Sequence, residues 1–113
     1  MAYDPHLADR FREALPVELP FSEKRMMGGL CFLLNGNMVG GADRAKTGEG
    51  RFMFRVGKEN ESIALARPGA SVVELGGRRM GGMIFVDEES CSLDDLRDWV
   101  FLALSFVETL PAK

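Results

Sequence analysis

Residues 24–39 read K-R-M-M-G-G-L-C-F-L-L-N-G-N-M-V, a short apolar run bracketed by two glycine-containing signals. Asn35-Gly36 between apolar flanks is typical of a two-residue type I′ hairpin turn, because both residues tolerate positive φ. The Gly28-Gly29 pair predicts a bulge or a close backbone approach between a first strand and a second one. Between residues 25 and 39 there is no acid, histidine or cysteine pair. This stretch therefore predicts a β-sheet and shows no chemistry of its own.

Upstream of this stretch, Asp4-Pro5 predicts the start of a helix, because Asp4 can cap free N–H groups and Pro5 lacks the N–H that would have no partner. Apolar residues at helical spacing extend this predicted helix over residues 5–15. Strands are predicted over residues 22–27, 30–34, 37–41 and 51–56, with a polar loop over residues 43–50. The strand over 51–56 has the alternation of a half-buried antiparallel strand, with Phe52, Phe54 and Val56 on one face and Arg51, Met53 and Arg55 on the other.

The second half of the chain continues with a predicted helix over residues 58–66 and a hairpin of strands 72–75 and 80–86 around Gly76-Gly77. Ser92 with Asp95 is a capping-box variant that opens a last helix over 93–110. The apolar arc of this helix comprises Leu93, Leu96, Trp99, Val100, Ala103, Leu104, Phe106, Val107 and Leu110.

The resulting order, α-β-β-β-α-β-β-α, predicts one α+β domain over residues 1–113, with a mostly antiparallel sheet and helices packed on one of its faces. Phe101 and Leu102 fall outside the apolar arc of the last helix, beside acidic residues. An exposed apolar pair on a small domain predicts an interface, so we expect a homodimer or a partner contact there.

Composition is that of a soluble globular protein, with 46% apolar and 27% charged residues in 113. We expect no signal peptide and no membrane segment, because no apolar run approaches the ~20 residues that a span needs. Cys31 and Cys91 fit reduced thiols better than a disulfide, which predicts a cytoplasmic location. The net charge of −3 conceals a basic centre between two acidic flanks, since residues 22–86 carry ten basic and six acidic side chains. We interpret this separation of charges first as solvent-exposed faces of the fold.

Residues 25–38, R-M-M-G-G-L-C-F-L-L-N-G-N-M, resemble the M-F-G-G-x-x-F-x-x-N-G-x-M signature of the TfoX/Sxy N-terminal domain family. The later segments F-M-F-R-V-G, A-R-P-G-A, G-R-R-M-G-G and L-R-D-W-V…L-P-A-K also look like that family, so nearly the whole chain is covered. Met27 departs from the pattern, because the family usually has an aromatic residue there. Longer members carry a C-terminal domain, whereas this sequence stops at Lys113.

The resemblance implies a regulatory domain associated with competence for DNA uptake, acting alongside a cyclic-AMP-responsive transcription factor in some bacteria. It implies no catalytic residue. We therefore expect no enzyme activity, no cofactor and a protein partner, with a transcription factor as the candidate.

Catalytic and metal-binding patterns are missing from the sequence. His6 is the single histidine and has no second ligand at a metal spacing. The sequence also lacks the G-x-S-x-G nucleophile elbow with which a histidine base would act. The paired glycines match neither phosphate-loop pattern. We do not expect direct DNA binding, because the pI is near 5.2.

Three hypotheses from different classes remain open. The leading one is a non-enzymatic regulatory or protein-interaction domain. The second is a nucleic-acid-binding accessory domain that uses a basic sheet face, and the third is a small-molecule-binding or enzymatic domain. The candidate interaction surface for these hypotheses consists of Lys24, Arg25, Arg55, Arg78, Arg79, Phe101 and Leu102.

Overall fold

An antiparallel sheet of six strands forms the centre of the computed structural model, which describes residues 3–26 and 28–113. Its spatial order is β1-β2-β3-β4-β6-β5. The strands are β1 (Phe21–Met26), β2 (Gly29–Leu34), β3 (Asn37–Arg44), β4 (Gly50–Arg55), β5 (Ala70–Leu75) and β6 (Arg78–Asp87). The helices are α1 (Pro5–Ala14), α2 (Glu61–Leu65) and α3 (Leu93–Val107), with 3-10 turns η1 (Lys58–Asn60) and η2 (Glu88–Ser90).

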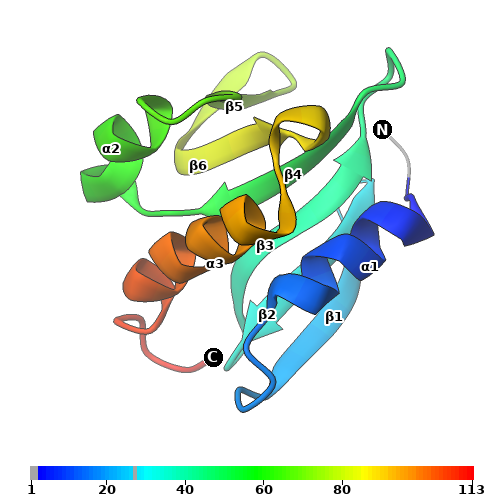
Figure 1. Cartoon of the computed structure of the whole chain (residues 1–113). Helices are drawn as coiled ribbons and strands as arrows, with labels where there is room; N and C mark the ends of the chain where they lie inside the picture. The colour runs from blue at the N-terminus through cyan, green and yellow to red at the C-terminus, as the bar shows by residue number, and fades with distance from the viewer. Residues whose placement is uncertain (1–2, 27) are drawn as a thin grey trace.

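The predicted α+β class with helices on one face of an antiparallel sheet is confirmed (Figure 1). The predicted order gave three strands before the second helix and so left out one of the four strands predicted there. The structure has all four, and β4, predicted over 51–56, pairs with β3 on one side and with β6 on the other. The predicted loop over residues 43–50 is too long. Strand β3 continues to Arg44 because Asp43, a polar residue, pairs across the strands with Arg51 through an Nε–Oδ1 contact of 2.8 Å.

Several predicted ends differ by one to three residues. The predicted helix over 58–66 begins as the 3-10 turn η1 and becomes α-helical only in α2. Helix α1 ends at Ala14, one residue early, and α3 ends at Val107 and not at residue 110. Pro111 explains why the helix does not include Leu110, because a proline disfavours the helical conformation of the residue before it. Met27, at the end of the first predicted strand, lies outside the described residues.

Both predicted helix caps are present. The Asp4 carboxylate accepts hydrogen bonds from the N–H groups of His6 and Leu7, at 2.9 and 3.2 Å. At the start of α3, the Ser92 hydroxyl accepts from the Asp95 N–H while the Asp95 carboxylate accepts from the Ser92 N–H, both at 3.1 Å. Each helix therefore starts where a side chain satisfies N–H groups that have no partner inside the helix.

The predicted hairpin turn joins β2 to β3. Asn35 has φ 53° and Gly36 has φ 82°, the positive values that a type I′ turn requires. The C-terminal segment docks on this turn, since the Lys113 N–H donates to the Asn35 carbonyl and the Asn37 side-chain amide donates to the Pro111 carbonyl, both at 2.9 Å. For Gly28-Gly29 the prediction was partly wrong. Gly28 belongs to the turn between β1 and β2, and the close approach of Gly29 is to β3, where a Cβ would lie 2.4 Å from the Ala42 carbonyl oxygen.

Gly36→Val is expected to lower the free energy of unfolding by about 1–2 kcal/mol, because a β-branched residue is strained at positive φ. The added Cβ would also lie 2.9 Å from the Cβ of Lys113. Urea unfolding followed by circular dichroism measures the change. Gly48→Val, at φ 98° with no atom within 4 Å of its Cβ, isolates the backbone strain from the contact with the C-terminal segment. An unchanged midpoint for Gly36→Val would contradict the turn assignment.

The main core lies between the sheet and the helices, and aromatic rings run through it from α1 to α3. Phe11 of α1 stacks on Phe32 of β2 with ring centroids 4.7 Å apart and planes at 1°, and also on Phe54 of β4 at 5.3 Å. Phe54 in turn stacks on Trp99 of α3 at 5.5 Å. As predicted, Phe52, Phe54 and Val56 are fully buried on this face.

The opposite face of the sheet is rich in methionine, and within residues 3–26 and 28–113 no helix packs on it. Its buried centre is Cys31, Met53, Val73 and Met83, flanked by the partly buried side chains of Met26, Met38, Met80 and Phe85. The Arg51 guanidinium lies 3.8 Å from the centroid of the Phe85 ring and covers part of this face. Long, flexible methionine side chains can thus fill this side of the sheet without a covering layer.

Candidate functional site

The predicted basic residues lie on three strands of the sheet, β1, β4 and β6. Lys24 and Arg25 are exposed on the edge strand β1. As neighbours on a strand they point to opposite faces. Arg55 is at the end of β4, three strands away, which at the usual strand spacing is about 14 Å. Arg78 and Arg79 begin β6. Lys24 and Arg25 therefore lie apart from Arg55, whereas Arg55 and the Arg78-Arg79 pair belong to the adjacent strands β4 and β6.

Three of these arginines have specific neighbours. The Arg25 guanidinium lies 4.1 Å from the centroid of the Tyr3 ring, and that of Arg55 lies 5.6 Å from the Phe106 ring. Arg79 forms a salt bridge with Glu61 of α2. The pKa of Glu61 is lowered, chiefly by the hydrogen bond that its carboxylate accepts from the Gly82 N–H and also by Arg79. Glu61 is therefore an ionised partner that ties α2 to β6.

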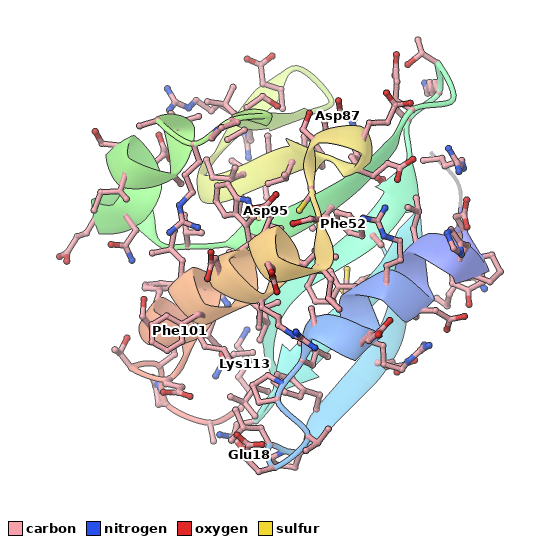
Figure 2. The ribbon with its side chains drawn as sticks, in the orientation of Figure 1. Glu18, Phe52, Asp87, Asp95, Phe101 and Lys113 are labelled. Atoms are coloured by element: carbon pink, nitrogen blue, oxygen red, sulfur yellow. The ribbon has the colours of Figure 1, made fainter. Side chains whose placement is uncertain are left out.

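Phe101 is exposed on α3, as its place on the helical wheel predicted, with 77% of its surface accessible. Figure 2 shows it on the side of α3 that does not face the sheet. Leu102 differs from Phe101, because it is half-buried and packs against the main core. Of the predicted pair, Phe101 is therefore strongly exposed, whereas Leu102 packs α3 against the main core.

A groove between α1 and α3 lies beside Phe101, and its cavity volume is about 340 Å³. Val17, in the loop after α1, also lines it and is 98% exposed. The floor is apolar, formed by Ala14, Leu15, Val100 and Leu104. Sequence reasoning found Phe101 but missed Val17, because a loop valine has no periodic pattern that marks it.

A second hollow, which we call the Gly57 cleft, lies where the end of β4, η1, the glycines of β6 and the end of α3 meet. Its volume is about 520 Å³, and its polar lining includes Arg55, Lys58, Asn60, Ser105 and Thr109. The third hypothesis required such a pocket, which could not be assembled from the sequence. The segments F-M-F-R-V-G and G-R-R-M-G-G contain parts of its wall, but their contact depends on the pairing of β4 with β6.

The thiols and the histidine show no catalytic arrangement in the described part of the chain. Cys31 and Cys91 are both free and buried. Burial raises the pKa of each thiol to about 11, with Asp43 adding to the effect at Cys31 and Asp95 at Cys91. Both thiols therefore stay protonated near neutral pH and are poor nucleophiles. His6 is exposed at the start of α1.

The described part of the chain comprises residues 3–26 and 28–113. These residues hold no group of three or more histidine, cysteine or acidic side chains placed to bind a metal ion. Among the same residues, no helix has the length and apolar character needed to cross a membrane. Comparison of the chain with protein-family models, with curated proteins and with solved structures finds no match.

Proposed function

We propose that this chain is a non-enzymatic protein-interaction domain with a regulatory role, similar to the TfoX/Sxy N-terminal domain, and that it binds a basic amphipathic helix of a protein partner along α3. The observation that carries the proposal is Phe101, a large apolar side chain 77% exposed beside an apolar groove. Aromatic side chains at the centre of a contact commonly supply most of the binding energy. A transcription factor remains the candidate partner that the resemblance implies.

The shape of this surface suits an amphipathic helix. The groove between α1 and α3 is lined on one side by Val17 and on the other by Phe101. An apolar side chain of a partner helix can enter between Val17 and Phe101. The next turn of that helix can then contact the Phe101 ring. This is the arrangement in which a helix places its apolar face into a groove, with anchors three or four residues apart.

The charge around Phe101 supports a partner protein over a second copy of the chain. The exposed side of α3 also carries Asp94, Asp98 and Glu108, with Arg97 as its only cation between residues 93 and 108. In a symmetric dimer the same patch meets itself, which would bring these carboxylates together. Like charges at an interface cost binding energy, whereas a basic partner would be attracted. The surface therefore favours a basic partner over a homodimer through α3.

The proposal is tested with a synthetic helical peptide of leucine and lysine at amphipathic spacing, followed by fluorescence anisotropy near physiological salt. Phe101→Ser is expected to weaken binding by about tenfold or more, which corresponds to about 1.4 kcal/mol. Ile63→Ser is the matched control, because Ile63 of α2 is also an exposed apolar side chain, at 58%. A peptide with glutamine in place of lysine should bind far more weakly. Equal effects of the two serine variants would contradict the proposal.

Two further measurements separate the alternatives. Sedimentation at high concentration is expected to show a monomer, and self-association that Phe101→Ser abolishes would favour the homodimer instead. Titration with a mixed-sequence DNA duplex near physiological salt is expected to show no binding, since the chain has a net charge of −3 and phosphate contacts weaken steeply with salt. Tight, sequence-selective duplex binding would overturn the proposal in favour of a nucleic-acid-binding domain.

A further inference from the structure

The Gly57 cleft has the dimensions of a small-molecule site. Its volume of about 520 Å³ lies within the 300–1,000 Å³ typical of ligand pockets. It shares no lining residue with the groove beside Phe101. An inference about this cleft is therefore independent of the proposed protein interaction.

Backbone contacts hold the cleft in shape. The N–H groups of Val56 and Gly57 both donate to the Gly82 carbonyl, at 2.9 and 3.1 Å, which closes the end of β4 onto β6. The Gly82 N–H donates to a Glu61 carboxylate oxygen at 2.7 Å. On the other side, the Phe106 ring packs so closely on Gly57 that a Cβ there would lie 2.5 Å from it. The wall is therefore formed by backbone and an aromatic ring, both of which are held in place.

Two cations line the cleft, and neither is engaged in a salt bridge within the described residues. Arg55 is half-buried, and its guanidinium rests over the Phe106 ring, which restrains it. The Lys58 stem lies against Gly81, where a Cβ would be 3.1 Å from the Lys58 Cε. Of the acids, Glu61 already has Arg79 and Gly82 as partners. Glu59 is exposed and also lines the cleft. The lining therefore carries two cations and one carboxylate, and its net charge is positive.

The remaining polar groups of the cleft present acceptors. The Ser105 hydroxyl donates to the Leu102 carbonyl and the Thr109 hydroxyl to the Phe106 carbonyl, both at 2.6 Å. The Asn60 amide NH₂ donates to the Val56 carbonyl at 3.0 Å. With these donors used, the hydroxyl oxygens and the Asn60 side-chain carbonyl are left to accept hydrogen bonds, and one Asn60 N–H is left to donate. A ligand that complements them carries hydroxyl or amino donors.

We propose that the Gly57 cleft binds a small organic oxyanion, a phosphate ester or a carboxylate, that also bears hydroxyl or amino groups. Arg55 and Lys58 hold the oxyanion through charge-assisted hydrogen bonds. The Ser105, Thr109 and Asn60 oxygens accept from the donors of the ligand. The Phe106 ring contacts its carbon skeleton, so the ligand must present an anionic end and a hydroxylated or aminated remainder.

The proposal is tested by titrating the ¹⁵N-labelled chain and following the amide resonances of Gly57, Lys58, Gly81 and Gly82. The probes are ribose 5-phosphate, gluconate, ribose and inorganic phosphate. Saturable shifts at these amides are expected with ribose 5-phosphate or gluconate, and which of the two binds more tightly distinguishes phosphate from carboxylate. Ribose and inorganic phosphate should each bind about tenfold more weakly, since each offers only part of the complementary chemistry.

Two variants locate the site. Lys58→Gln is expected to weaken binding of the better probe by about tenfold while the exposed position leaves the fold intact. Lys46→Gln, at an exposed lysine in the turn between β3 and β4, should leave the affinity unchanged. Phe101→Ser should also leave it unchanged, so failure here is distinguishable from failure of the protein interaction. Shifts that do not saturate, or equal losses in Lys58→Gln and Lys46→Gln, would overturn the proposal and indicate general attraction of anions to surface cations.

Discussion

Phe11→Ala is expected to lower the free energy of unfolding by about 3–5 kcal/mol, the range for truncation of a buried aromatic side chain. Phe11 is fully buried and stacks on both Phe32 and Phe54. Its removal leaves a cavity at the point where α1 contacts the sheet, and the neighbouring rings on β2 and β4 cannot both collapse into it. Domains of this size have about 5–15 kcal/mol of stability in total, so the variant should be marginally folded.

Urea unfolding followed by circular dichroism and by Trp99 fluorescence measures this loss. The control is Phe101→Ala, the same substitution at an exposed position of α3, which is expected to change stability by less than about 0.5 kcal/mol. If Phe11→Ala and Phe101→Ala had similar effects, the packing of α1 on the sheet would be contradicted.

Gly57→Ala is expected to lower the free energy of unfolding by about 2–4 kcal/mol, through two separate causes. Gly57 has φ 85°, a conformation that costs an L-residue about 1–2 kcal/mol. The added methyl would also lie 2.5–2.9 Å from three atoms of the Phe106 ring. Either α3 shifts away from the end of β4 or the ring leaves its place, and both changes loosen the packing around the Gly57 cleft.

Gly77→Ala separates the two causes. Gly77 has φ 77° in the turn between β5 and β6, and a Cβ there meets nothing within 4 Å, so only the backbone cost of about 1–2 kcal/mol is expected. Combining Gly57→Ala with Phe106→Ala should be less destabilising than the sum of the single variants, because the second truncation removes the clash. Strict additivity would show that the ring does not contact Gly57 in solution.

Local chemistry explains the elements that the sequence predicted well. The caps at Asp4 and Ser92 depend on side chains within three residues of the groups they satisfy. The Asn35-Gly36 turn depends on the φ values that two adjacent residues tolerate. These signals act over a few residues, so they can be read without knowledge of the rest of the chain.

Boundaries were less well predicted, because they depend on neighbours in space. Strand β3 continues past residue 41 because Asp43 forms a salt bridge with Arg51 on β4. The predicted helix over 58–66 starts as a 3-10 turn where the chain leaves β4. There the Glu61 carboxylate contacts β6 through the Gly82 N–H and the Arg79 guanidinium. Arg51 is not next to Asp43 in the sequence, and Gly82 and Arg79 are not next to Glu61. Without these partners, a polar segment cannot be distinguished from a loop.

The candidate sites divide in the same way. The sequence indicated Phe101, since a helical wheel shows an apolar residue on a polar side regardless of what lies beyond it. It could not indicate that Val17 stands beside the same groove, or that Lys58 joins Arg55 in a cleft. These residues are brought together by the packing of α1 on α3 and by the pairing of β4 with β6.

By itself, the sequence determined the fold class, the helix caps, the glycine turns and which side of α3 is exposed, because hydrophobic periodicity and turn chemistry are properties of short segments. Only the tertiary structure decided the strand order β1-β2-β3-β4-β6-β5, the separation of Lys24 and Arg25 from Arg55 and the positions of the groove and the cleft. The physical reason is that strand pairing and helix packing bring together residues far apart in the chain, and the apolar surfaces that drive this association are non-directional.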